Sequence, residues 1–276
     1  MFNNVKEAPW KVILACLLVN TCMVTLINLV LFPSTFFDPL TKATSGLIGA
    51  TLQANLLNLL LFCLIVFGWA RLRPSDVGLV WSKALPGLGM TALLWLGTQA
   101  VVLLTNWLNG DIHLDPLWSS HGVAPVLGAF IGQLLGNAFF EEVNYRGFYL
   151  SQFYLKIRNP DNAQRLTLAI LSMVTLFILS HIPNRIFSGY TLADMPFDFA
   201  LLFIWGLFFT IIYLASGNLF LAIGVHALLN QPTMITEAAF PVQILLFVLT
   251  CILLAILRLG KRNAVSDSTS PAQAGS

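Results

Sequence analysis

Two carboxylates and a guanidinium interrupt one of the most apolar stretches of this chain. Glu141 and Glu142 follow Phe140 directly, and Arg146 comes four residues after Glu142. An ionisable side chain at bilayer depth costs roughly 2.5–3.5 kcal/mol on the lenient insertion scale, so such residues face a protein interior or a wet cavity and mark function. A glutamate in a low-dielectric pocket is suited to act as a general base, which is the role we predict for Glu141.

The second glutamate has a different predicted partner. On a helix Glu142 lies about 100° around the axis from Glu141, and Arg146 lies one turn further along the face of Glu142. We therefore expect Glu142 and Arg146 to form an ion pair that neutralises charge and orients the helix.

Three further polar residues lie in later apolar segments. His181 stands four residues after Phe177, and Asn230 stands four residues after His226. Residues four apart share one face of a helix, so His226 and Asn230 point the same way. Peptide hydrolysis needs an activated water, a group that takes its proton, and donors for the oxyanion that forms on the scissile carbonyl. Together with the glutamates, these residue types supply each of those parts.

The same residues allow two other interpretations. His181, His226 and one glutamate make a three-ligand zinc set with an open position for water, and the other glutamate then serves as base. Buried charges at 141, 142 and 146 also suit a structural ion-pair cluster or the ion pathway of a transporter. A transporter, however, has no need of both histidines and Asn230 at these offsets, so we favour hydrolysis.

The composition of the chain indicates which kind of secondary structure positions these residues. Of the 276 residues, 57% are hydrophobic and 9% are charged, whereas a soluble domain averages about 25% charged residues. The mean hydropathy is +0.81. Apolar runs of about 20 residues indicate membrane spans. The dispersed net charge of +2 gives no basic face for nucleic acid. We predict an all-α, polytopic membrane protein.

Eight apolar segments follow one another along the chain, and we predict one helix for each. The segment at 219–231 is short for a full span, so it is tilted, tightly paired with its predecessor or partly inserted. The segments lie at 11–32, 47–70, 85–108, 124–150, 166–184, 198–215, 219–231 and 240–258.

The basic residues predict the orientation. With the amino terminus inside, the outer loops carry only Lys42 and Arg185, and the remaining loop Lys and Arg residues fall inside. This bias predicts eight spans with both termini in the cytoplasm. We interpret 1–262 as a single transmembrane domain. We expect 263–276 to be a disordered cytoplasmic tail, because it has little apolar surface to offset the entropy of ordering.

The order of the motifs resembles a known family. Glu-Glu-x-x-x-Arg at 141–146, Phe-x-x-x-His at 177–181 and His-x-x-x-Asn at 226–230 resemble the CPBP family of CAAX prenyl proteases and bacteriocin-processing enzymes, also called Abi. The resemblance covers roughly residues 120–245. One departure is Asn144, which is polar where the pattern has an aliphatic residue.

The resemblance implies an intramembrane endopeptidase of CAAX prenyl protease type. Glu141 would activate water with help from His181, and His226 and Asn230 would donate to the oxyanion. The implied partners are the lipid bilayer and a lipidated or membrane-anchored peptide, reached from the cytoplasmic side or laterally. The cofactor would be either none or zinc, and the short-looped architecture suggests a bacterial plasma membrane. The alternative from another class is a catalytically idle member that acts as a bacteriocin immunity or scaffold protein.

Overall fold

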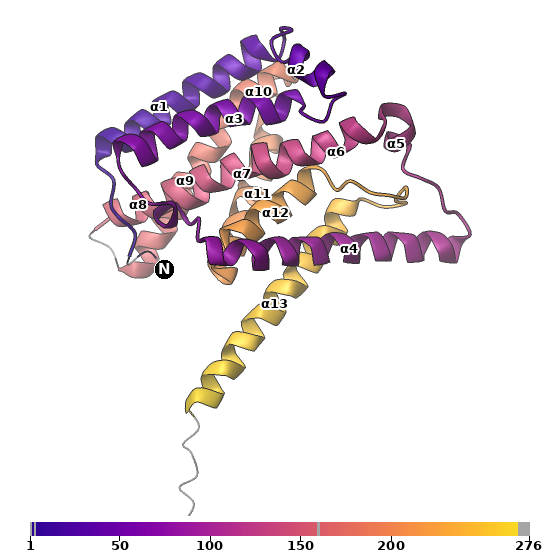
Figure 1. Cartoon of the computed structure of the whole chain (residues 1–276). Helices are drawn as coiled ribbons and strands as arrows, with labels where there is room; N and C mark the ends of the chain where they lie inside the picture. The colour runs from indigo at the N-terminus through magenta and orange to yellow at the C-terminus, as the bar shows by residue number, and fades with distance from the viewer. Residues whose placement is uncertain (1, 3, 159–160, 270–276) are drawn as a thin grey trace, which may run out of the picture.

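The computed structural model of the chain describes residues 2, 4–158 and 161–269, with the backbone alone for 261–269. It is built almost wholly from helices (Figure 1). The α-helices are α1 (Trp10–Leu26), α2 (Asp38–Ala43), α3 (Ala50–Cys63), α4 (Ala84–Asn109), α5 (Pro116–His121), α6 (Val123–Ile131), α7 (Ala138–Glu141), α8 (Leu150–Lys156), α9 (Asn162–Ser180), α10 (Ile182–Phe187), α11 (Met195–Ser216), α12 (Leu219–Asn230) and α13 (Val242–Thr269). Four π-helical and two 3₁₀ segments join them, namely η1 (Ile27–Leu31), η2 (Leu64–Trp69), η3 (Pro74–Val77), η4 (Trp81–Lys83), η5 (Gly132–Asn137) and η6 (Glu142–Tyr149).

The membrane-spanning elements match the hydropathy prediction closely. Among the described residues, seven helical segments are long and apolar enough to cross a membrane. They are Trp10–Leu31, Ala50–Trp69, Trp81–Asn109, Val123–Lys156, Asn162–Phe187, Met195–Ser216 and Val242–Gly260. The eighth predicted segment is α12. The chain is therefore a multi-pass helical bundle, as predicted.

Helix α12 is short because the protein, and not lipid, surrounds it. Its twelve residues rise about 18 Å, well below the roughly 30 Å of a bilayer core. Eleven of the twelve, Leu219–Leu229, are buried. It packs closely on α4, where a Cβ on Gly224 would overlap the Thr91 side chain and one on Gly87 would lie 2.8 Å from Phe220. Such small residues let membrane helices approach one another.

One end of the bundle gathers the amino-terminal segment with two later connections. We call it the basic end, and it comprises residues 4–11, 70–83, 156–158 and 217. The backbone N–H of Lys6 donates to Asp76 Oδ1 at 3.1 Å, and Glu7 pairs with Lys156 at 2.7 Å and Arg158 at 3.0 Å. Figure 1 shows the N-terminus beside α8 at this end.

The other connections gather at the far end, which comprises residues 32–49, 110–122, 187–195 and 231–241. Leu114 and Thr236 form an isolated antiparallel bridge, and Asn106 Nδ2 donates to the Glu237 carbonyl at 2.7 Å. Successive spans run alternately from one end to the other, as expected for helices that cross a membrane in turn. Which end faces the cytoplasm stays a prediction.

The ion pairs at the basic end give a pH-dependent contribution to stability. A hydrogen bond from Lys156, aided by the charges of Lys156 and Arg158, lowers the pKa of Glu7 from 4.5 although partial burial opposes this. A lowered folded-state pKa stabilises the fold above the unfolded pKa, and that stabilisation is lost as pH falls through the folded value. We expect Glu7→Gln to lower stability by up to about 1 kcal/mol at pH 7. The difference from wild type should shrink below about pH 4.5, as measured by unfolding in detergent from pH 7 to 3. A difference that grows on acidification would contradict the pairing.

The predicted tail is partly helical. Helix α13 continues to Thr269, so residues 263–269 are helical and the expectation of disorder there is wrong. No proline interrupts the chain between Val242 and Thr269, and the first one comes at Pro271. Residues 270–276 of the predicted tail lie outside the described residues.

Candidate active site

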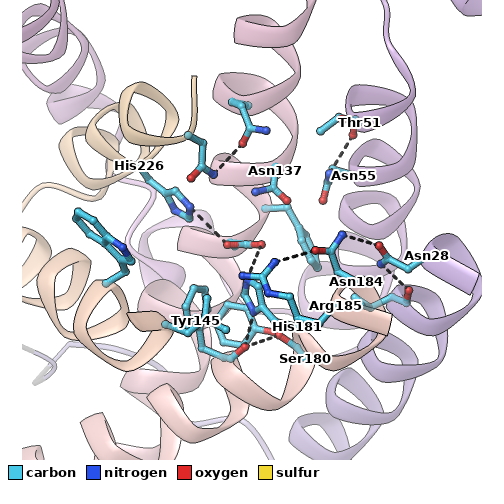
Figure 2. A pocket seen from close by; sticks show the side chains of 18 of the residues that line it. Asn28, Thr51, Asn55, Asn137, Tyr145, Ser180, His181, Asn184, Arg185 and His226 are labelled. Atoms are coloured by element: carbon cyan, nitrogen blue, oxygen red, sulfur yellow. Dashed lines mark hydrogen bonds and ion pairs between the residues drawn. The ribbon is translucent and has the colours of Figure 1, made fainter. Parts of the chain in front are cut away.

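A cavity of about 540 Å³ opens between the helices, and Glu141 lies in its wall. The Glu141 side chain is 14% exposed. His181, His226 and Asn230 line the same cavity, whereas Glu142 and Arg146 do not and lie behind its wall. Figure 2 shows side chains from several helices converging on this space. Four of the six predicted site residues thus share one cavity, and the other two support it.

The glutamates lie where one membrane helix changes from π-helical to α-helical winding and back. The span Val123–Lys156 contains η5 and η6, and the single α-helical turn α7 between them ends at Glu141. A π-turn carries an extra residue and occurs often at functional sites. Gly136 brings this helix close to α3, since a Cβ there would lie 3.2 Å from the Leu52 Cα. Winding and close packing together fix the direction of the Glu141 side chain.

Glu142 and Arg146 form the ion pair that their spacing predicts. Arg146 Nη1 donates to Glu142 Oε1 at 3.0 Å, and both side chains are fully buried. Arg146 Nη2 donates to the Gly206 carbonyl at 2.9 Å. The guanidinium also lies 4.6 Å from the ring centroid of Phe177 and 5.4 Å from that of Phe209. Arg146 therefore ties the glutamate helix to α9 and α11.

His226 bridges the two glutamates. Its Nδ1 lies 2.8 Å from Glu142 Oε1, and because a carboxylate only accepts hydrogen bonds, we assign the Nδ1 proton to this contact. Its Nε2 lies 3.6 Å from Glu141 Oε2. The ring stacks on Phe209 with centroids 4.1 Å apart. Gly217, at a φ of 69°, ends α11 tightly enough to place α12 and its histidine against that ring.

His181 approaches Glu141 from the opposite side. It follows the last residue of α9, and its Nδ1 lies 2.7 Å from the Phe177 carbonyl, which can only accept. The Nδ1 proton therefore belongs to that contact, and Nε2 points to Glu141 Oε1 at 3.9 Å. Phe177 thus orients His181 through its carbonyl and packs against it with its ring, at a centroid distance of 4.5 Å.

Asn230 reaches the cavity but bonds to a residue that the sequence analysis missed. Its Nδ2 donates to Gln133 Oε1 at 3.0 Å. Gln133 lies in η5, eight residues before Glu141. The available signal was a polar residue two turns from Glu141 within the same apolar segment. Gln133 holds the Asn230 amide on the side of the cavity that His226 occupies.

The predicted zinc ligands, His181, His226 and one glutamate, do not form a metal-binding arrangement. Throughout the part of the chain that the structure describes, no group of three or more His, Cys, Asp or Glu side chains has an arrangement that would hold a metal ion. Glu141 faces His181 and His226, but at 3.9 and 3.6 Å. No chemical step below depends on a metal.

Asn144, the departure from the family pattern, lies away from Glu141. It is 1% exposed and lines a separate small cavity of about 10 Å³ together with Asn20 and Asn58. Asn20 Nδ2 donates to the Tyr145 hydroxyl at 3.2 Å, and Tyr145 lines the large cavity. The polar substitution therefore changes the packing behind the site and not the wall around Glu141.

One comparison with known proteins found a match. Residues 123–231 match the family model for Type II CAAX prenyl endopeptidase Rce1-like. No curated protein and no solved structure matches the chain. The matched segment runs from the start of α6 to the residue after α12 and contains all six predicted site residues. At the family level the match implies hydrolysis of a peptide substrate. Over residues 123–231, this multi-pass membrane protein is therefore similar to the Rce1-like type II CAAX prenyl endopeptidases.

Proposed function

We propose that the protein is an intramembrane endopeptidase in which Glu141 activates the hydrolytic water. Its substrate is a membrane-anchored or lipidated peptide, and its location is the plasma membrane. One observation carries the proposal: Glu141 faces two imidazole Nε2 atoms inside a cavity, at 3.9 and 3.6 Å, while Glu142 is already engaged by Arg146 and His226. The two adjacent glutamates therefore have different roles: Glu141 activates water, and Glu142 holds Arg146 and His226.

The water lies between Glu141 and His181. With its Nδ1 proton on the Phe177 carbonyl, neutral His181 has a lone pair at Nε2, so Nε2 and the Glu141 carboxylate are both acceptors. A water molecule spans the 3.9 Å between them with two hydrogen bonds of about 2.8 Å. Glu141 takes one proton as the water oxygen attacks the scissile carbonyl carbon, and returns it to the leaving amine as the C–N bond breaks.

The oxyanion lies on the opposite side, towards His226 and Asn230. Asn230 keeps its second amide N–H free of the Gln133 contact, and that N–H donates to the developing charge. His226 donates from Nε2 when its ring carries a second proton, with its other N–H held by Glu142. Gln133 acts as a positioning residue for Asn230.

The test is a cleavage assay with purified protein in detergent and a fluorogenic membrane-peptide library, with and without chelator. We expect wild-type protein to cleave at least one peptide and to keep that activity in chelator. Cleavage that a chelator abolishes and zinc restores would contradict the metal-free mechanism. Peptides that bind without being cut would support the idle binding role instead.

Asn230→Ala should lower kcat by roughly 10²–10³-fold, because one donor to the oxyanion is lost. The KM should change less, since the contact strengthens only as charge develops. The measurement is steady-state kinetics on the peptide found above. Asn109→Ala, an exposed asparagine at the end of α4, is the matched control and should match wild type. Equal kcat values for the two variants would remove Asn230 from the mechanism.

A further inference from the structure

The small cavity of about 10 Å³ lies directly behind the wall of the catalytic cavity. Asn58 and Phe140 line both cavities, so these two side chains lie between them. Phe140 is the residue before Glu141. Most of the small cavity is apolar, but three asparagines from three helices also line it. They are Asn20 in α1, Asn58 in α3 and Asn144 in η6, and we call them the asparagine triad.

The asparagine triad contains three buried polar atoms that need partners. Asn20 Oδ1, Asn58 Oδ1 and Asn144 Nδ2 have no hydrogen-bond partner among the described residues. The Asn20 and Asn58 residues are 7% exposed, and Asn144 is 1% exposed. A buried polar group without a partner costs its full desolvation penalty, and such groups are rare in folded proteins. Three of them around one cavity therefore point to a bound molecule that pairs with all three.

The three atoms match the hydrogen-bonding capacity of water. Two of them are carbonyl oxygens, which accept, and the third is an amide nitrogen, which donates. A water molecule can donate two hydrogen bonds and accept at least one. A cation would face the N–H groups of Asn144, and an anion would face two oxygens, so neither fits this set. A buried water needs roughly 10–15 Å³ and two to four polar partners. The cavity meets both conditions.

We propose that the asparagine triad binds one structural water molecule. The water donates to Asn20 Oδ1 and Asn58 Oδ1 and accepts from Asn144 Nδ2. It is distinct from the water that Glu141 activates, and its presence does not depend on whether the protein cleaves peptides. The site accounts for a polar residue at Asn144. It also joins the glutamate helix to α1 and α3, which lie outside the matched residues 123–231 and pack side by side (Figure 1).

The bound water also fixes one part of the catalytic wall. With its Oδ1 held by the water, the Asn20 amide keeps one orientation, in which Nδ2 donates to the Tyr145 hydroxyl at 3.2 Å. Tyr145 lines the catalytic cavity, and its ring meets the Phe177 ring edge-on with centroids 5.2 Å apart. The Phe177 carbonyl lies 2.7 Å from His181 Nδ1. Asn20 is thus a positioning residue for the wall beside His181.

Unfolding of the full chain in detergent tests whether the amides share one water. Asn58→Leu and Asn144→Leu should each lower the folded-to-unfolded ratio by roughly fivefold or more, because each leaves other amides of the triad unpaired. The double variant should lose less than the product of the two single effects, since the second change removes a group that the first left unpaired. Asn109→Leu, at an exposed position of α4, is the control and should have little effect. A double loss equal to the product would mean that the two amides act independently, and would overturn the proposal.

The wild-type protein supplies a test that needs no variant. In a crystal structure of the full chain that resolves ordered water, one peak should lie within about 3.2 Å of Asn20 Oδ1, Asn58 Oδ1 and Asn144 Nδ2. Crystals of Asn144→Leu should lack this peak. Direct pairing of the three amides with one another, and no peak between them, would overturn the proposal. A peak contacted by oxygen atoms alone, with the Asn144 N–H groups turned away, would identify a cation and overturn it as well.

Discussion

A Glu141→Gln variant should fold as the wild type does and lose peptide cleavage by roughly 10²–10⁴-fold, the contribution of a general base. The amide keeps the size of the side chain but cannot take a proton from water. No contact of Glu141 with a histidine is shorter than 3.6 Å, and its Oε2 has no hydrogen-bond partner among the described residues. Removing the charge of Glu141 should therefore change the stability of the fold little. The measurement is kcat together with the unfolding midpoint in detergent.

The neighbouring residue supplies the control. Glu142→Gln removes a charge of the same type one position away, but it breaks the bonds to Arg146 and His226. Its main effect should be a lower unfolding midpoint, with activity falling as the fold does. If Glu141→Gln kept more than a tenth of wild-type kcat at an unchanged midpoint, Glu141 would not be the base.

An Arg146→Met variant should lose about 3–5 kcal/mol of stability, because it leaves the buried Glu142 carboxylate without its cation. The Glu142 and Arg146 side chains are both 0% exposed. Removing one partner of a buried pair costs more than the pair contributes, since the remaining charge is desolvated and uncompensated. Methionine keeps the length and apolar packing of the side chain against Phe177. Equilibrium unfolding in detergent measures the loss.

The double variant Glu142→Gln/Arg146→Met tests the physical reason. With both charges gone, the unpaired carboxylate no longer exists, so the double variant should be more stable than Arg146→Met alone. Additive losses would mean that Arg146 stabilises the fold through packing, and not through its charge. Arg185→Met is a useful comparison, because the Arg185–Asp198 pair is partly exposed and its loss should cost less.

The sequence carried most of the information on spans and on one ion pair. Hydropathy located the membrane helices, because burial in lipid demands long apolar runs whatever the tertiary packing. The Glu142–Arg146 pair followed from spacing, because residues four apart meet on a helix before any other element packs on it. Short-range regularity made both predictions secure.

Contacts between distant segments were beyond such reasoning. Gln133 bonds to Asn230 across 97 positions, and Asn184 bonds to Asn28 across 156. A single Asn or Gln in an apolar helix gives no sign in the sequence of whether its side chain faces lipid, another amide or a cavity. The position of the cavity along the bundle also depends on which helix ends pack together.

The π-helical winding around Glu141 constrains how this segment can change in length. Removing one residue between Glu142 and Arg146 would change the four-residue spacing at which Arg146 Nη1 donates to Glu142 Oε1. It would also change which residue lies against the Val77 carbonyl, where any Cβ in place of Gly147 would overlap. A single substitution here affects one contact, whereas a deletion affects both the Glu142–Arg146 pair and the packing of Gly147 on Val77. Over evolution, insertions and deletions should therefore accumulate in the loops and spare residues 132–149.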